Sequence, residues 1–242
     1  MNGRELGRQP LTGGLNTNYF VDSQGREALL RVPRGNKDLF ENIVYEYQYI
    51  GFTADAGRVR RRSPQEQFDF SWKAAKAGLL VLPPLAIDGD NITYPFLSQA
   101  QTLDEYFRYH RSDQHVLIYK LIADLQKAHS LGFVYGDRWS GNMLVDPQLG
   151  LVHIDFDLKI SGRTAVDLDV AQVFYHTLWA GGDEVLPLLA LMLGTSGNWF
   201  DFAKTSKYML GFAKFLSKTP VGGIGDKTEE LIGVADMIRS KN

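Results

Sequence analysis

The amino-acid sequence predicts an α+β fold of two lobes, a β-rich lobe in residues 1–98 and a mainly helical lobe in residues 99–242. Three observations support this prediction. Short runs of β-branched and aromatic residues, separated by glycine turns, dominate the first part of the chain. Longer stretches with apolar residues at helical spacing dominate the second part. Within that second part, residues 135–157 hold several polar side chains on predicted turns.

The composition suits one compact unit. The chain has 242 residues, 44% of them hydrophobic, and a formal net charge of −2, so its overall charge does not indicate nucleic acid or an anionic membrane as a partner. The chain has no cysteine, which excludes disulfides, thiolate catalysis and cysteine-bound zinc. It opens on a polar segment and has no run near the roughly 20 apolar residues of a membrane span. We therefore expect a soluble, cytoplasmic protein.

The first lobe opens with predicted strands and tight turns. Residues 11–21 indicate a strand, a glycine turn and a second strand. Residues 22–25, with the sequence Asp-Ser-Gln-Gly, indicate a hairpin turn. Residues 28–32 then indicate a third strand, which Pro33 ends because proline lacks the N–H that a strand ladder needs.

Two helices are predicted later in this lobe, at residues 38–50 and 65–77. The second begins with Ser-Pro-Gln-Glu at residues 63–66, a capping box with proline at the first helical position. Residues 79–83 and 91–98 indicate two more strands, and the latter runs into a linker to the second lobe.

The second lobe is predicted to be mostly helical around one hairpin. Residues 113–131 have a broad apolar face at helical spacing. Residues 143–146 and 151–154 indicate two short strands joined by a turn. A helix over residues 167–179 follows, and residues 181–242 are expected to form two or three short amphipathic helices.

Three polar side chains, Asp137, Asn142 and Asp155, are predicted to meet at the ends of this hairpin. Asp137 and Asn142 are five residues apart, and Asp155 follows thirteen residues later, after the second strand. The first spacing is common by chance, but the strand, turn and strand that lead to Asp155 make the pattern specific. A kinase catalytic loop uses one carboxylate to orient the attacking hydroxyl, and an Asn and a second Asp to hold Mg²⁺. We therefore expect Asp137 to be the catalytic carboxylate and Asn142 and Asp155 to be metal ligands.

The loop at residues 135–142, Tyr-Gly-Asp-Arg-Trp-Ser-Gly-Asn, resembles the catalytic loop of the kinase-like phosphotransferases. These include aminoglycoside phosphotransferases, choline kinases and fructosamine kinases. The resemblance implies a bilobal protein-kinase-like fold that uses ATP and Mg²⁺. Two positions depart from the pattern: Tyr135 stands where His is usual, and Arg138 where Leu is usual. Arg138 could bind a phosphate of the acceptor or pin a neighbouring loop, and the sequence leaves both open.

The resemblance also implies a phosphate-binding turn. Gly13, Gly14 and Asn16 match a glycine turn that lies over the nucleotide phosphates in that family. Glycine suits this role because backbone amides approach phosphate oxygens closely only where no Cβ intervenes. An ordinary hairpin turn is the alternative interpretation.

Further nucleotide contacts follow from the same resemblance. Arg31, on the third strand, is expected to pair with the α- and β-phosphates and with a glutamate on a helix. Glu66 is the favoured partner and Glu46 the alternative. The backbone of Phe96 and Ser98 is expected to meet the edge of the adenine.

After Asp155 the chain reads Phe-Asp, where Phe-Gly is commonest in the family. Asp157 is not expected to impair catalysis, and small bacterial kinases of the lipopolysaccharide type are similar at this point. Either Asp167 or Asp169 is expected to brace the catalytic loop.

Two other features are interpreted as structural. The basic cluster at residues 58–62 is predicted to be a solvated loop, with binding of RNA or of a phosphorylated substrate as the alternative. His129 and His153 occupy apolar-face and strand positions, where a packed histidine is the expected state.

The favoured function is an ATP- and Mg²⁺-dependent phosphotransferase that acts on a hydroxyl of a small-molecule acceptor. A small atypical Ser/Thr protein kinase similar to the RIO and KEOPS-complex kinases is the second hypothesis. A nucleotide-binding pseudokinase is the third, although the intact Asp137, Asn142 and Asp155 set argues against it. ATP and a hydroxyl-bearing acceptor are the expected partners, without membrane or nucleic acid.

Overall fold

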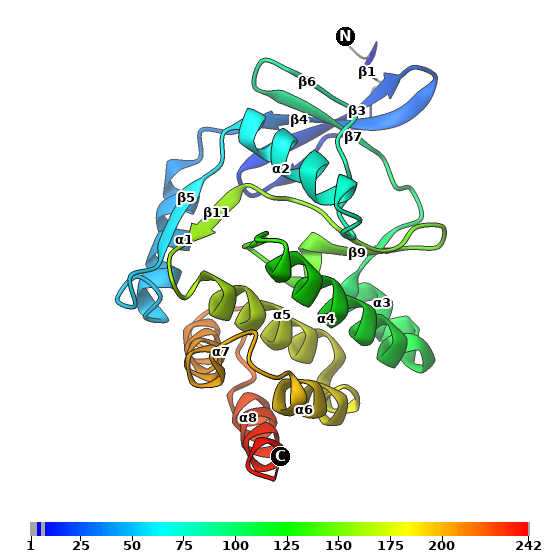
Figure 1. Ribbon diagram of the computed structural model, residues 1–242. Helices are drawn as coiled ribbons and strands as arrows, with labels where there is room; N and C mark the ends of the chain where they lie inside the picture. The colour runs from blue at the N-terminus through cyan, green and yellow to red at the C-terminus, as the bar shows by residue number, and fades with distance from the viewer. Residues whose placement is uncertain (1–3, 6–7, 242) are drawn as a thin grey trace.

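An antiparallel sheet forms the first lobe in the computed structural model, which describes residues 4–5 and 8–241 (Figure 1). The strands run in the order β1-β3-β4-β7-β6, and β2 pairs with β3. Their bounds are β1 Arg4–Glu5, β2 Leu11–Gly13, β3 Asn16–Ser23, β4 Arg26–Pro33, β6 Ala86–Asp88 and β7 Asn91–Pro95. The predicted hairpin between β3 and β4 is confirmed, and its turn residues Gln24 and Gly25 both have positive φ, as a tight hairpin turn requires.

Two helices flank this sheet, α1 (Lys37–Tyr49) and α2 (Pro64–Lys76). The predicted capping box of α2 is confirmed: the Ser63 hydroxyl accepts from the Glu66 N–H at 3.2 Å, and the Glu66 carboxylate accepts from the Ser63 N–H at 2.9 Å. Helix α1 packs against the second lobe, since the Tyr47 hydroxyl accepts a 2.9 Å hydrogen bond from Gln172 on α5.

The basic segment at residues 58–62 was predicted to be a solvated loop, and this prediction is wrong. Residues Arg58–Arg61 form strand β5, which pairs antiparallel with β11 (Leu158–Ser161). The partner strand lies about a hundred residues further along the chain, so the pairing leaves no local signal. The strand predicted at residues 79–83 is also absent; there the chain makes one isolated bridge, between Val81 and His153.

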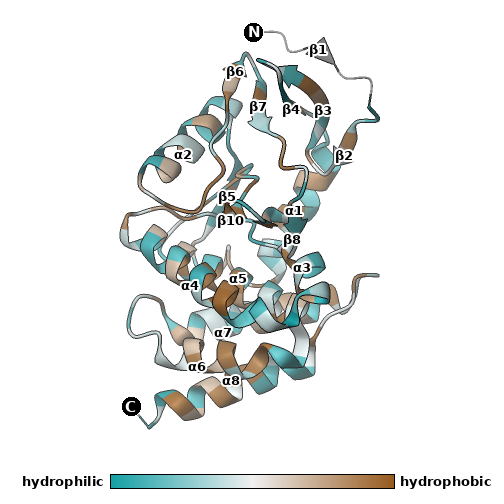
Figure 2. Ribbon diagram, turned by 90° about the vertical axis from the view of Figure 1, so that its right-hand side faces the viewer, coloured by the Kyte–Doolittle hydropathy of each residue, from teal (hydrophilic) through white to brown (hydrophobic). Residues whose placement is uncertain are grey.

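The second lobe consists of helices around α5, most of whose residues are buried. Figure 2 shows α5 inside this lobe, next to α4 and α7. The helices are α3 Leu103–Tyr109, α4 Gln114–Ser130, α5 Ala165–Gly181, α6 Leu186–Thr195, α7 Phe202–Leu216 and α8 Gly225–Arg239. The three helices after residue 181 confirm the predicted two or three. No helix in the described part combines the length and apolarity needed to cross a membrane.

A short hairpin lies between Asn142 and Asp155, two of the predicted site residues. Strands β9 (Met143–Asp146) and β10 (Gly150–His153) pair antiparallel, and β8 (Gln101–Thr102) adds to β9. This hairpin was predicted from the sequence and is confirmed within one residue at each end. It begins directly after Asn142 and ends two residues before Asp155, so it brings these two side chains to the same end.

Candidate active site

The catalytic loop predicted from the sequence forms a closed turn around Asp137. The Asn142 side-chain nitrogen donates to the Asp137 backbone carbonyl at 2.9 Å and to the Asp137 carboxylate at 3.3 Å. A 3₁₀ turn over Ser140–Asn142 brings the amide back to Asp137. Both bonds use the amide nitrogen, so they leave the amide oxygen of Asn142 available as a metal ligand.

Asp137 and Asp155, the two acidic residues predicted for the site, have a strained backbone. Asp137 has φ 43° and Asp155 has φ 59°, in the left-handed region that residues with a side chain rarely adopt. Gly136, with φ 69°, precedes Asp137. Such conformations cost about 1–3 kcal/mol each and persist only when the surroundings hold them. The contacts of the loop must therefore supply that restraint.

Arg138 supplies much of it. Its side chain is fully buried, and its guanidinium donates to the backbone carbonyls of Ile154 at 3.0 Å, Asp155 at 2.6 Å and Asn142 at 3.3 Å. Its Nε also donates to the carbonyl of Gly136. The sequence left two roles open for Arg138, and these contacts decide between them: it pins the two loops together and has no exposed surface for an acceptor.

A second anchor is the carboxylate of Asp169, on α5. It accepts from the backbone N–H groups of Tyr135 and Gly136, both at 2.8 Å, and lies 2.9 Å from the His129 ring. Asp169 is completely buried, so these bonds replace the water it has lost. Of the two candidates, Asp169 is the one that braces the catalytic loop. Asp167 instead accepts from the backbone N–H of Asp201 at 2.8 Å.

Tyr135, at the position where His is usual, anchors the loop through its hydroxyl. The hydroxyl donates to Asp124 of α4 at 2.5 Å, and Asp124 also accepts from the Leu80 N–H at 2.9 Å. The ring of His153 packs 4.7 Å from the Tyr135 ring. Burial lowers the pKa of His153 well below its usual value, so its 3.5 Å approach to Asp124 is not an ion pair. The prediction that His153 is a packed histidine is confirmed.

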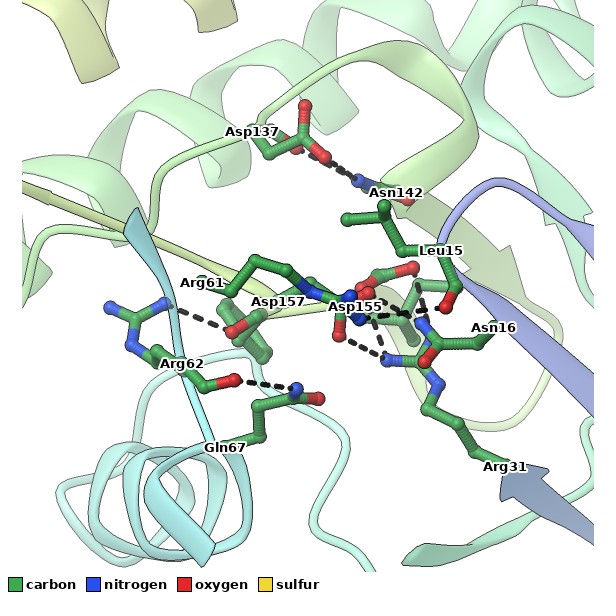
Figure 3. Close-up of polar contacts among 12 residues, drawn as sticks. Leu15, Asn16, Arg31, Arg61, Arg62, Gln67, Asp137, Asn142, Asp155 and Asp157 are labelled. Carbon is green, nitrogen blue, oxygen red and sulfur yellow. Dashed lines mark hydrogen bonds and ion pairs between the residues drawn. The ribbon is translucent and has the colours of Figure 1, made fainter. Parts of the chain in front are cut away.

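The first lobe meets the segment that follows β10, with Asp155 and Asp157, through Arg31 and Asn16 (Figure 3). The Arg31 guanidinium makes two contacts with the Asp155 carboxylate, at 3.0 and 2.9 Å, and one with Asp157 at 3.1 Å. The Asn16 amide donates to the other oxygen of Asp157. The glycine turn and β4 are therefore tied to the segment that follows β10.

These contacts set the charges of the two carboxylates. Burial raises the pKa of Asp157, and the neighbouring charge of Asp155 raises it further. Burial acts in the same direction on Asp155, but Arg31 outweighs it and holds the pKa of Asp155 below its usual value. Asp155 is thus the anion of the pair. Its side chain is 26% exposed, whereas that of Asp157 is 5% exposed, so Asp155 is also the one that a ligand can reach.

The expected ion pair between Arg31 and Glu66 is not formed. The Glu66 carboxylate binds Arg60, at 2.5 and 2.7 Å, and the start of its own helix. Its capping position turns the side chain back towards the N-terminus of α2, away from the sheet. The next residue, Gln67, is buried and donates to the Arg62 carbonyl at 3.3 Å. Arg31 takes its counter-charges from the second lobe instead.

Glu46, the alternative partner, lies near Asp137 and is not among the charges that shift the pKa of Arg31. Burial raises the pKa of Glu46 to about 7, and the negative charge of Asp137 contributes to this rise. Burial also raises the pKa of Asp137 to about 6, with Asp155 adding to the effect. Helix α1 therefore brings a third carboxyl group to the neighbourhood of the predicted catalytic residue, which the sequence pattern did not indicate.

A pocket of about 270 Å³ opens between the sheet and the hairpin. It combines apolar walls with a charged end formed by Arg31 and Asp155. Phe96 is among the lining residues, whereas Ser98 is exposed and lies outside the lining, which includes Leu97 and Ala100. The full lining consists of Leu11, Asn18, Leu29, Arg31, Leu82, Tyr94, Pro95, Phe96, Leu97, Ala100, Leu144, Ile154 and Asp155.

The predicted phosphate-binding turn lies at the edge of this site. Gly13 ends β2, Gly14 has φ 21°, and Asn16 begins β3 with its side chain on Asp157. Adding a Cβ to Gly14 would bring it 3.4 Å from the Leu39 side chain, which is ordinary contact. The turn therefore uses glycine for its backbone conformation rather than for lack of space.

Comparisons with known proteins give a likeness in fold alone. No family model and no curated protein sequence matches the chain. Among solved structures it is similar to the Rio2 kinase from Chaetomium thermophilum, in a complex with ADP, Mg²⁺ and phosphoaspartate. The TM-score is 0.48 at 15% sequence identity, and the alignment covers 99% of this chain and 73% of that chain. The α+β class with a sheet-rich first lobe and a helical second lobe is as the sequence predicts.

Proposed function

We propose that the protein transfers the γ-phosphoryl group of ATP to a hydroxyl group of a small-molecule acceptor in the cytoplasm. One observation carries this proposal: buried Arg138 fixes the loop of Asp137 and Asn142 to the backbone of Asp155, beside a pocket that ends in Arg31. Three groups suited to phosphoryl transfer are thus held together beside the charged end of a cavity, and two of them, Asp137 and Asp155, are on strained backbone.

Asp137 is the group that receives the proton. The acceptor oxygen forms a bond to the γ-phosphorus, the bond from that phosphorus to the ADP oxygen breaks, and the hydroxyl proton passes to the Asp137 carboxylate. Its raised pKa, about 6, makes it a better base than an ordinary carboxylate and still leaves it mostly ionised at pH 7. The hydrogen bond from Asn142 orients that carboxylate.

Asn142 and Asp155 are the residues that would hold Mg²⁺. One amide oxygen and one carboxylate suit this hard cation, which takes its remaining ligands from phosphates and water. When bound, the ion neutralises charge on the transferred phosphoryl group. Asp155 is shared with Arg31, which also contacts Asp157. The apolar walls around Phe96 suit the adenine.

The short connection after Asp157 favours a small acceptor over a protein. Only residues 158–164 separate Asp157 from α5, and four of them form β11. This part of the described chain has no long loop that could present or bind an extended peptide. A protein substrate in the manner of the RIO and KEOPS kinases is the second candidate, and a nucleotide-binding pseudokinase is the third.

The test is ATP turnover with Mg²⁺ in wild type and in Asp137→Asn, with a set of small hydroxyl acceptors and with generic protein substrates. Phosphate transfer to a small acceptor should fall by about a hundredfold or more in the variant, while ATP binding is kept. Transfer to protein alone would favour the second candidate. ATP binding with no transfer in either protein would contradict the proposed catalysis.

A further inference from the structure

Arg61 differs from its neighbours Arg60 and Arg62 in the direction of its side chain. Arg60 forms the ion pair with Glu66, and Arg62 is buried and donates to the Phe156 carbonyl at 3.1 Å. Successive side chains of a strand point to opposite faces, so Arg61 leaves β5 on the other side from these two. In Figure 3 it extends from the strand towards the glycine turn.

The contacts of Arg61 are long and neutral. One guanidinium nitrogen donates to the Leu15 carbonyl at 3.5 Å and another to the Arg34 carbonyl at 3.3 Å, both longer than the usual distance of about 2.9 Å. Within the described residues, no carboxylate is at ion-pair distance from it. A partly buried guanidinium with five donors and no anion is suited to bind one, and phosphate matches its planar fork.

The surroundings of Arg61 correspond to the phosphate end of the pocket. Leu15 belongs to the glycine turn, and the next residue, Asn16, binds Asp157. On the other side, Arg61 pairs across the β5–β11 ladder with Leu158, which directly follows Asp157. The guanidinium therefore lies between the glycine turn and the segment that carries the two aspartates. A nucleotide with its adenine near Phe96 would extend its phosphates in this direction.

Arg31 alone is poorly placed to bind all the phosphate charge. Its guanidinium already contacts Asp157 and the ionised Asp155, and the charge of Asp155 cancels its positive charge locally. Arg61 has no such counter-charge. We propose that Arg61 is a second phosphate-binding residue, which contacts the terminal phosphates of the nucleotide across the cleft from Arg31. This inference rests on the proposed function, because it takes the pocket to be a nucleotide site.

The test is the binding of ATP and of adenosine, each in the presence of Mg²⁺, to wild type and to Arg61→Gln by titration calorimetry. Arg58→Gln is the matched control, because Arg58 is an exposed arginine on the same strand. We expect Arg61→Gln to weaken ATP binding by about tenfold or more, since a charge-assisted hydrogen bond is lost, and to leave adenosine binding unchanged. Arg61→Lys should restore part of the affinity, and Arg58→Gln should bind like wild type.

Three outcomes separate this inference from the function on which it rests. Equal ATP affinity in wild type and Arg61→Gln would overturn the role of Arg61, even if phosphate transfer is intact. Wild type that binds ATP no more tightly than adenosine would overturn it as well. Selective loss of ATP affinity in Arg61→Gln, together with no transfer to any acceptor by wild type, would support the phosphate contact and contradict the proposed catalysis.

Discussion

Arg138 donates a 2.6 Å hydrogen bond to the backbone carbonyl of Asp155 and so joins the catalytic loop to the end of the hairpin. Every hydrogen-bond partner of its guanidinium among the described residues is a backbone carbonyl, and it also lies over the rings of Phe156 and Tyr135, at 4.7 and 5.8 Å from the ring centroids. A buried cation whose hydrogen bonds all go to backbone carbonyls fixes the positions of two loops and does not bind a ligand. The strained φ values of Asp137 and Asp155 are the conformations that it helps to maintain.

We expect Arg138→Leu, which restores the residue usual in the resembling kinases, to destabilise this protein. Leucine fills part of the volume but leaves four carbonyls without their donor, and a buried unsatisfied group costs about 1–3 kcal/mol. The free energy of unfolding, measured in urea at pH 7, should fall by about 2–4 kcal/mol. Arg138→Lys should lie between wild type and Arg138→Leu, because Lys keeps the charge but lacks the planar fork. An unchanged free energy of unfolding in Arg138→Leu would show that the two loops keep their positions without the hydrogen bonds of Arg138.

The two aspartates at the end of the hairpin should respond differently to neutralisation. Asp155 is the ionised member of the pair beside Arg31, so Asp155→Asn should lower the free energy of unfolding by about 2 kcal/mol or more. Asp157 has a raised pKa because it is buried next to Asp155. Asp157→Asn should therefore change the free energy of unfolding by less than about 1 kcal/mol. The measurement is urea unfolding at pH 7 without Mg²⁺. The reverse order of stabilities would mean that Asp157 is the anion.

The sequence predicted the parts of the fold that depend on local rules. The capping box of α2, the hairpin turn before β4 and the hairpin after Asn142 each lie within a few neighbouring residues, and all three are present. The pairing of β5 with β11 depends on residues far apart in the chain, so the arginine cluster was misread as a loop. Backbone pairing of this kind leaves no pattern in either segment alone.

The site could be predicted where its side chains follow a spacing motif. It was harder to predict where the hydrogen-bond or ion-pair partner of a side chain depends on the three-dimensional fold. Asp137 and Asn142 are in contact, as their spacing indicates. Glu66 had two plausible roles, and its capping position directs it to Arg60 rather than to Arg31. The role of Arg138 could not be chosen because its acceptors are backbone carbonyls, which any residue type supplies.

Asp55 links the loop after α1 to α7 and should stabilise the fold above pH 4. Its carboxylate contacts Lys204 at 2.8 Å, Lys207 at 2.7 Å and the Tyr208 hydroxyl at 2.8 Å. The hydrogen bonds from the two lysines hold its pKa below the usual range. A lowered pKa means that the stabilisation is complete above the unfolded-state value of about 3.9 and is lost as the pH falls below it.

Asp55→Asn should therefore lower the free energy of unfolding by about 1–2 kcal/mol at pH 7, and the difference from wild type should shrink below pH 4. The control is Glu41→Gln. Its ion pair with Lys37 is 61% and 83% exposed, so this change should have an effect below about 0.5 kcal/mol. Equal losses in both variants would contradict a special role for Asp55.

Glu46 should be unfavourable to the folded state when it is ionised. Burial and the negative charge of Asp137 raise its pKa to about 7, against about 4.3 in the unfolded chain. A raised carboxyl pKa costs stability as the pH rises from the unfolded value to the folded one, because the unfolded chain ionises first. Glu46→Gln should then be more stable than wild type by about 2 kcal/mol at pH 8 and equal to it at pH 4. Urea unfolding of both proteins across this range is the measurement. A variant that is less stable than wild type at pH 8 would contradict this expectation. It would mean that ionised Glu46 has a cationic partner in the folded protein that outweighs burial and the repulsion from Asp137.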